Sequence, residues 1–322
     1  MGMREQIVNF NKQFAFEPEI KNAANLRKYK KFIVAGMGGS HLAGDLIKGW
    51  MPELDIVINS DYGLPTINES RKSETLLIAS SYSGNTEETL DAFKKAQEEN
   101  ISIAVVAAGG ELLRLADETG SPYVQLPDTG IQPRMATGFS FKALLKLMGQ
   151  EDALKEVTAL AGTLKPSEYE DEGKALAERL RGHIPVIYSS SRNRATAYNW
   201  KIKFNETGKI PAFCNAFPEL NHNEMTGFDI QEATSDLSKN FYFIILRDRN
   251  DHPKILKRME VMAGLLKKRG LPPEFVELKG KNIFEKMFAS LVLADWVALY
   301  TAEGYGVESE KVPMVEEFKK LI

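Results

Sequence analysis

The sequence predicts an α/β protein of two doubly wound, flavodoxin-like units, each a parallel sheet flanked by helices. Three observations support this fold class. Short apolar runs of strand length alternate with stretches of helical periodicity along the 322 residues. Two of these runs lead directly into a Gly- or Ser-rich loop and then a helix. The order strand, small-residue loop, helix recurs in the second half, which indicates a weak internal duplication.

We expect one unit over residues 1–150 and the other over 151–322, the latter ending in a short helix. The charged helical stretch 151–182 carries the joint, and residues 4–29 are expected to form an amphipathic helix and a lead-in. The expected strands are 32–35, 56–59, 75–79, 102–106, 123–126, 185–188, 241–246 and 273–278.

Composition excludes several classes of protein. The net charge of −3 and the absence of a basic block argue against a nucleic-acid-binding protein. The single cysteine, Cys214, permits no disulfide within the chain and no Cys-rich metal site. No apolar run approaches membrane-spanning length, and the first residues lack the apolar core of a signal peptide. We therefore expect a cytoplasmic protein.

Residues 80–89, Ser-Ser-Tyr-Ser-Gly-Asn-Thr-Glu-Glu-Thr, organise the first half of the chain. They follow the apolar run 75–79 and lead into a helix, so hydroxyl groups gather where backbone N–H groups lack partners and the helix dipole is positive. Such a place suits a small dianion, for example a phosphate monoester. The loop lacks the lysine of a nucleotide-binding P-loop. An ordinary strand-to-helix turn capped by Ser or Thr is the alternative.

A second loop, Gly36-Met37-Gly38-Gly39-Ser40-His41, follows the strand at 32–35. Its glycines let a ligand approach the backbone, although their spacing does not fit the dinucleotide fingerprint. Ligands bind at the carboxyl ends of strands in doubly wound sheets, so two such loops strengthen the prediction of a binding site. Arg134, after an irregular crossover, suits an anionic ligand or alternatively pairs with a surface acid.

Two further residues have side chains suited to proton transfer. His222 lies in a polar, irregular stretch and can titrate near neutral pH, although a loop histidine without a role is the alternative. Glu206 ends an expected helix, where it is either a general base or a solvated carboxylate. The histidines show no metal-ligand spacing, so a metal site is not expected.

Taken together, the motifs around Gly39-Ser40, Ser81–Thr89 and Pro133-Arg134 resemble the sugar isomerase (SIS) fold family. The stretches Asn205-Glu206 and Glu219–Glu224 narrow the match. With them, the chain resembles the bifunctional phosphoglucose/phosphomannose isomerases of archaea and some bacteria. The resemblance spans nearly the whole chain, and the run Ser81–Thr89 is fairly specific to the family.

The resemblance implies two SIS subdomains and a reversible aldose–ketose isomerisation of glucose 6-phosphate and mannose 6-phosphate with fructose 6-phosphate. It also implies the roles of the residues that bind the sugar phosphate. The phosphate is held by Ser81, Ser83 and Thr86, and Gly39 and Ser40 lie near the sugar. No cofactor and no metal are implied.

Four further residues are implied to act on the reacting carbons and the sugar ring. Glu206 moves a proton between C2 and C1 through a cis-enediol, and Arg134 stabilises the negative charge that forms. His222 helps to open the ring, reaching in from the neighbouring subunit of a homodimer. Lys319 shares that task, with Lys320 one register position away.

One position departs from the family pattern. Relatives tend to carry Thr before the proline that leads the last helix, and this Thr has been tied to tolerance of both C2 epimers. Here Val312 precedes Pro313, so mannose 6-phosphate is the substrate in question.

Two alternatives compete with the isomerase interpretation. A non-catalytic sugar-phosphate sensor of this fold would not need Glu206 and His222, and residues 1–30 are too short for the usual DNA-binding helix-turn-helix. The isomerase half of a glucosamine-6-phosphate synthase would normally come with an N-terminal Cys nucleophile, whereas Cys214 lies in mid-chain.

Overall fold

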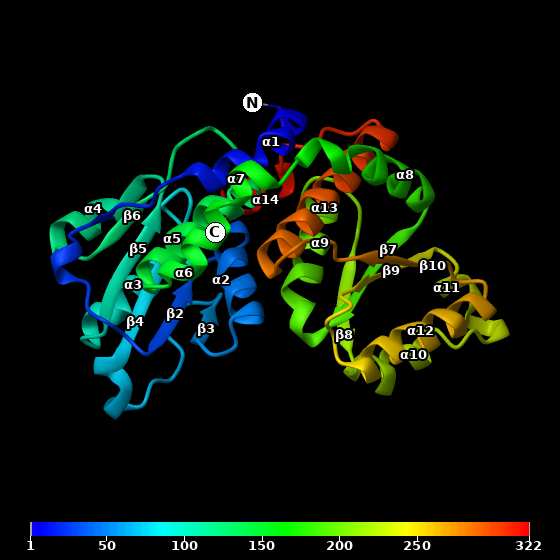
Figure 1. Ribbon diagram of the computed structural model, residues 1–322, viewed down its shortest axis with the longest axis horizontal. Helices are drawn as coiled ribbons and strands as arrows, with labels where there is room; N and C mark the ends of the chain where they lie inside the picture. The colour runs from blue at the N-terminus through cyan, green and yellow to red at the C-terminus, as the bar shows by residue number, and fades with distance from the viewer. Residues whose placement is uncertain (1, 322) are drawn as a thin grey trace. The chain divides into compact units, whose positions relative to one another are not determined.

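The computed structural model describes residues 2–321, which form two compact units (Figure 1). The first unit comprises Asn9–Leu164, and the second comprises Gly2–Val8 together with the chain from Lys165 onward. The joint lies beyond residue 150 because two helices after that point, α6 (Glu151–Thr158) and α7 (Leu160–Thr163), pack against the first unit.

The first unit contains a six-stranded sheet in the order β1-β6-β5-β4-β2-β3. All neighbours pair in parallel except the two-residue edge strand β1, which pairs antiparallel with β6. The strands are β1 (Ile20–Lys21), β2 (Lys31–Ala35), β3 (Asp55–Asn59), β4 (Thr75–Ser80), β5 (Ser102–Ala107) and β6 (Tyr123–Gln125). The strands expected in this half are therefore confirmed.

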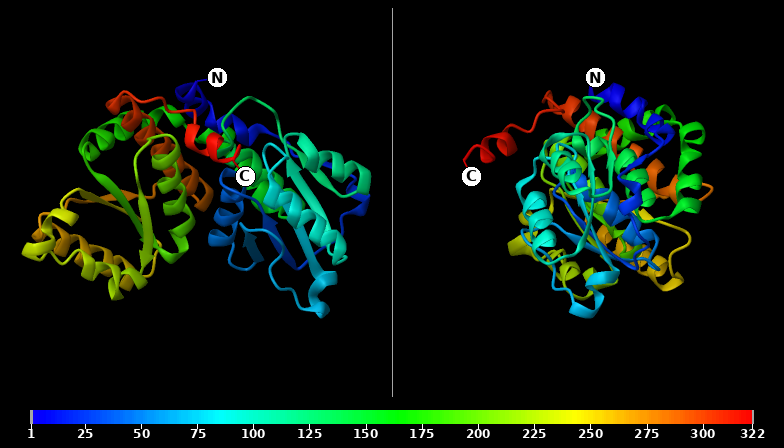
Figure 2. Two further views of the ribbon diagram at one scale, coloured as in Figure 1. Left: turned by 180° about the vertical axis from the view of Figure 1, so that it is seen from behind. Right: turned by 90° about the vertical axis from the view of Figure 1, so that its left-hand side faces the viewer.

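Helices cover both faces of this sheet. The unit's remaining α-helices are α2 (Gly39–Trp50), α3 (Glu87–Glu98), α4 (Gly110–Thr119) and α5 (Thr137–Leu147). Figure 2, seen from behind, shows α3 and α4 over one face, while α2 and α5 pack against each other. Every residue of β4 is buried, with Leu77 and Ala79 facing α3, which explains its uninterrupted apolar sequence.

The expected helix in residues 4–29 is mostly wrong. The segment holds only one turn and a half of α-helix, α1 (Met3–Val8), followed by a 3-10 helix, η1 (Phe10–Ala15), and then β1. Phe10 and Phe14 are fully buried and Gln13 donates to the carbonyl of Met135 at 2.7 Å. Tertiary contacts thus determine the conformation of this segment more than helical periodicity does.

The second unit contains a four-stranded parallel sheet in the order β10-β9-β7-β8. Its strands are β7 (Ile184–Ser190), β8 (Phe213–Phe217), β9 (Phe241–Arg247) and β10 (Pro273–Glu277). Its remaining α-helices are α8 (Glu170–Leu180), α9 (Arg194–Glu206), α10 (Glu224–Gly227), α11 (Ser235–Ser238), α12 (Pro253–Lys268), α13 (Ile283–Tyr305) and α14 (Pro313–Phe318). The edge strand β8 was not expected from the sequence.

Both sheets reverse the direction of their strand order at the same point of the topology. In the first, the chain leaves β2 for β3 on one side and returns to β4 on the other. In the second, β7, β8 and β9 follow the same course. The carboxyl ends of β2 and β4, and those of β7 and β9, are therefore the switch points where doubly wound folds bind ligands. Within residues 2–321, the structure has no helix both long and apolar enough to cross a membrane.

Candidate active site

Three hydroxyl groups converge in the loop between β4 and α3. The hydroxyl of Ser81 lies 2.8 Å from that of Thr86 and 3.4 Å from that of Ser83. Ser81 is buried, Thr86 is partly buried and Ser83 is exposed, so the group grades from the interior to the surface. The loop ends at the start of α3, a helix of 12 residues whose first N–H groups face this end. The arrangement suits a dianion.

Ser80 and Ser40 connect this loop to the glycine loop after β2. The hydroxyl of Ser80 donates to the carbonyl of Ser40 at 2.8 Å, so it does not point with the other three. The hydroxyl of Ser40 accepts from the backbone N–H of Tyr82 at 3.0 Å. Ser40 is only 8% exposed. The Ser40 hydroxyl therefore fixes the backbone of the loop that carries Ser81 and Ser83.

Glycine is required where the glycine loop meets its neighbours. A Cβ atom on Gly39 would lie 2.8 Å from the backbone nitrogen of Arg134, and one on Gly36 would lie 2.6 Å from the carbonyl oxygen of Ser80. Arg134 is 2% exposed, and its guanidinium lies 3.5 Å from the side-chain oxygen of Gln132. The backbone of the Arg134 segment therefore lies close against the start of α2.

The first unit thus brings together the six candidates that the sequence placed in it: Gly39, Ser40, Ser81, Ser83, Thr86 and Arg134. They gather at the carboxyl ends of β2 and β4, which is the switch point of the sheet. The remaining three candidates, Glu206, His222 and Lys319, belong to the second unit.

Glu206 is the last residue of α9, and several contacts fix that end of the helix. Asn205 donates to the carbonyl of Ile210 at 3.0 Å. Lys209, which has a left-handed backbone with φ of 58°, donates from Nζ to the carbonyl of Glu206 at 2.5 Å and also to that of Lys311. The end of α9 is therefore tied to the segment that leads into α14.

His222 ends the 3-10 helix η7 (Glu219–His222), and its loop is anchored through Glu224. The hydroxyl of Tyr188, on β7, donates to the Glu224 carboxylate at 2.6 Å, and Asn215, on β8, donates to its other oxygen. Burial, followed by the bond to Glu224, raises the pKa of Tyr188. His222 and Lys319 are both exposed, so the second unit by itself does not enclose their side chains.

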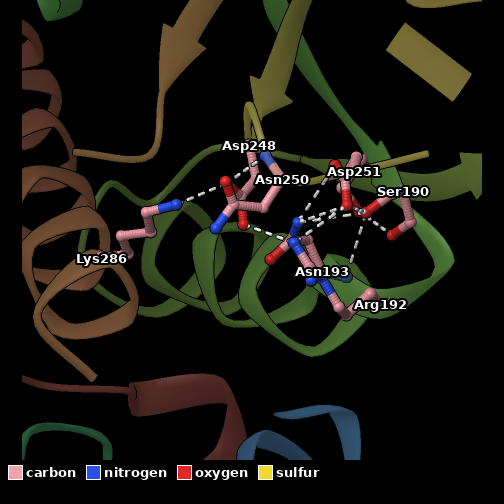
Figure 3. A network of polar contacts seen from close by, with 8 residues as sticks. Ser190, Arg192, Asn193, Asp248, Asn250, Asp251 and Lys286 are labelled. Carbon is pink, nitrogen blue, oxygen red and sulfur yellow. Dashed lines mark hydrogen bonds and ion pairs between the residues drawn. The ribbon is translucent and has the colours of Figure 1, made fainter. Parts of the chain in front are cut away.

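The switch point of the second unit differs in kind, because acidic residues occupy it (Figure 3). Asp248, directly after β9, is fully buried and accepts from Arg192 at 2.6 Å and from Lys286 at 2.7 Å. Asp251 accepts from Ser190 at 2.9 Å and lies 3.4 Å from Arg192. Burial raises the pKa of the Asp251 carboxyl.

These two carboxylates lie after β9, the counterpart of β4, where the first unit presents hydroxyls. The cations Arg192 and Lys286 at this switch point are already paired with these carboxylates. Sequence reasoning missed the network, although the pattern Asp-Arg-Asn-Asp after the strand at 241–246 was a visible signal.

Comparison with known proteins finds relatives in the family that the sequence motifs resemble. A relative from Aquifex aeolicus, named bifunctional phosphoglucose/phosphomannose isomerase, is 31% identical over 98% of this chain and 96% of its own length. One of the same name from Thermoplasma volcanium is 32% identical over the full length of both. A relative from Sulfolobus acidocaldarius, named D-glucosamine-6-phosphate 4-epimerase, is 26% identical over 96% of this chain and 94% of its own length.

Solved structures support the fold. Glucosamine-6-phosphate deaminase from Thermotoga maritima superposes with a TM-score of 0.70 at 16% identity, covering 97% of both chains. Tagatose-6-phosphate ketose/aldose isomerase from Escherichia coli gives 0.66 at 14% identity, covering 95% of this chain and 94% of the other. Residues 169–322 match the family described as bacterial phospho-glucose isomerase C-terminal SIS domain. The chain belongs to the bifunctional phosphoglucose/phosphomannose isomerase family.

Proposed function

We propose that this protein interconverts glucose 6-phosphate, and mannose 6-phosphate, with fructose 6-phosphate by moving a proton between C2 and C1. Two relatives named for this activity match this chain over nearly the whole length of both proteins. In this chain the proposal rests on one observation: three hydroxyls lie close together at the switch point of the first unit, those of Ser81, Ser83 and Thr86.

In this proposal the three hydroxyls and the start of α3 hold the phosphate, and Gly39 and Ser40 border the sugar. Ser40 acts mainly through the backbone of Tyr82, whose N–H it accepts at 3.0 Å. Binding energy from the phosphate, remote from the reacting carbons, orients the sugar for proton transfer.

Glu206 is proposed as the base that carries the proton between C2 and C1. A proton next to a carbonyl is too weakly acidic for a carboxylate to remove unless the enediolate is stabilised as it forms. Arg134 would supply that stabilising charge, and a well-placed base contributes about 10²–10⁴-fold. In the reaction as a whole, one proton moves between C1 and C2 and one moves between the oxygens on these carbons, so the oxidation state of the whole sugar is unchanged and no redox cofactor is required.

His222 and Lys319 are proposed to assist ring opening, with Lys320 as the alternative to Lys319. The exposure of His222 supports an active site completed across a homodimer, in which His222 serves the neighbouring subunit. We further propose that the enzyme acts in the cytoplasm on a small-molecule substrate, without a nucleic acid or membrane partner.

The first test incubates the purified protein with fructose 6-phosphate in D₂O, without added metal, and identifies the products by NMR. Glucose 6-phosphate and mannose 6-phosphate, both with deuterium at C2, are expected. If glucose 6-phosphate alone forms, Val312→Thr is expected to raise the mannose 6-phosphate fraction. Sugar-phosphate binding without conversion would instead support a sensor.

The role of Glu206 is tested by Glu206→Gln, with Glu156→Gln, at an exposed position of α6, as the matched control. Glu206→Gln is expected to reduce turnover by at least about 10²-fold while leaving sugar-phosphate binding within a few-fold, and Glu156→Gln is expected to change neither. Turnover at the wild-type level in Glu206→Gln would remove this residue from the mechanism.

A further inference from the structure

Residues 108–111, which join the end of β5 to the first residues of α4, pack against the loop of residues 81–86, called the phosphate loop below. We propose that this 108–111 loop, together with Asn85, is a clamp that sets the position of the phosphate-binding hydroxyls. Its residues act as positioning residues, because they contact the loop that holds the ligand. The inference rests on the proposed phosphate site, and it assigns a function to two glycines and an asparagine that the reaction itself does not use.

Three hydrogen bonds join the two loops. The N–H of Ala108 donates to the carbonyl of Tyr82 at 2.9 Å, and the N–H of Leu112 donates to the carbonyl of Gly84 at 3.0 Å. The N–H of Glu111 donates to the side-chain oxygen of Asn85 at 3.0 Å. Two of these donors come from the first turn of α4, where N–H groups have no partner within the helix. The start of α4 is therefore committed to holding the phosphate loop.

The backbones of the two loops meet at paired glycines. A Cβ atom on Gly84 would lie 1.8 Å from the carbonyl oxygen of Gly109, and one on Gly110 would lie 2.3 Å from the carbonyl oxygen of Ser83. Real Cβ atoms do not approach backbone this closely, so a side chain at either position must push the loops apart. Both glycines also have left-handed backbones, with φ of 72° for Gly84 and 76° for Gly110.

The clamp acts on the part of the phosphate loop that burial does not hold. Ser81 is buried at the base of the loop, but Ser83 and Asn85 are exposed at its tip. Displacing the tip would move the Ser83 hydroxyl away from the phosphate and leave the reacting carbons untouched. A hydrogen bond to a charged group corresponds to about 10- to 100-fold in affinity.

The test compares Gly110→Ala with Gly149→Ala. Gly149, after α5, has φ of 70° and open space where its Cβ would lie, so both variants carry the same left-handed backbone penalty and only Gly110→Ala adds a collision. The dissociation constant of inorganic phosphate is measured by NMR titration, together with KM and kcat for fructose 6-phosphate. Asn85→Ala, which removes an acceptor without a collision, serves as the second variant if Gly110→Ala does not fold.

Gly110→Ala is expected to raise both the phosphate dissociation constant and KM about 10- to 100-fold, with kcat within about threefold of wild type. Asn85→Ala is expected to change them in the same direction by a smaller factor, and Gly149→Ala to leave them within about twofold. Equal phosphate affinities in the Gly110 and Gly149 variants would overturn the clamp, as would a loss confined to kcat.

Phosphate binding separates this inference from the proposed reaction. If the protein binds phosphate but does not isomerise the sugar, the same loss of affinity in Gly110→Ala would still support the clamp. If it isomerises the sugar and Gly110→Ala retains wild-type KM and phosphate affinity, the reaction stands and the clamp is wrong.

Discussion

Lys203 and Asp295 form an ion pair in the interior of the second unit, and breaking it gives a sharp test of how α9 is held. Lys203 Nζ lies 2.5 Å from the Asp295 carboxylate, and the two side chains are 3% and 1% exposed. The pair joins α9 to α13, one helical turn before Glu206. We consider Asp295→Leu, Lys203→Met and the double variant.

The expected loss of stability follows from the burial of this ion pair. Removing one partner of a buried pair leaves the other charge uncompensated and costs about 3–5 kcal/mol. Replacing both by apolar side chains of similar size is neutral or stabilising. For a unit of this size, each kcal/mol lowers the melting temperature by about 2–4 °C, so each single variant should melt about 6–20 °C lower. The double variant should recover most of that loss.

The tryptophans of the second unit can report its unfolding. Of its three tryptophans, Trp200 lies on α9 and Trp296 on α13 next to Asp295. Their indole N–H groups donate to Ser290 at 2.9 Å and to the carbonyl of Pro166 at 2.8 Å. In a Trp50→Phe background, tryptophan fluorescence therefore follows the unfolding of the second unit.

Two results would refute the reasoning. If a single variant loses less than about 1 kcal/mol of unfolding free energy, the remaining charge must be solvated by water, as the charges of an exposed ion pair are. A double variant as unstable as the sum of the singles would mean that the two side chains act through separate packing contacts.

Three further outcomes are expected. Burial lowers the pKa of Lys142 below its usual 10.5, so the native state loses this proton first. The unfolding free energy of wild type relative to Lys142→Met should therefore rise with pH from that lowered pKa up to about 10.5, and a flat difference in urea midpoints would contradict this. Tyr188→Phe removes a donor to Glu224 and should slow turnover of the cyclic sugar more than that of an open-chain substrate; equal losses would argue against anchoring of the His222 loop. Lys209→Met should lower kcat through the end of α9 while inorganic phosphate affinity remains unchanged, and a parallel loss of phosphate affinity would contradict that.

The parts of the fold that the sequence predicted well are those in which burial on both faces makes a strand apolar throughout. β4 is such a strand, and the two loops at the switch point follow from where it and β2 end. The edge strand β8 was missed because its sequence, Phe-Cys-Asn-Ala-Phe, is interrupted by Asn215, which bonds to Glu224. Edge strands need not be apolar on both faces, so their sequences resemble loops.

Some features of the candidate site could likewise be predicted from the sequence, whereas others could not. Ser81, Ser83 and Thr86 are neighbours in one loop, so their convergence could be predicted from sequence alone. The hydrogen bond from Tyr82 to Ser40 and the collision surface at Gly110 depend on separate loops meeting at the sheet edge. Spacing along the chain carries no information about such contacts, and they required the structure.

The acidic network of Asp248 and Asp251 has a consequence for how the protein responds to its substrate. Any ligand that binds only the native state stabilises it by RT ln(1 + [L]/Kd), about 2.7 kcal/mol at a hundredfold excess over Kd. In the proposed function the first unit binds the phosphate of the substrate, so its resistance to unfolding should rise and fall with the sugar-phosphate concentration. In the second unit the Asp248 and Asp251 carboxylates are part of the chain, so the ion pairs that they form do not depend on the concentration of any ligand. Depletion of the sugar phosphate should therefore lower the resistance of the first unit to heat and proteases.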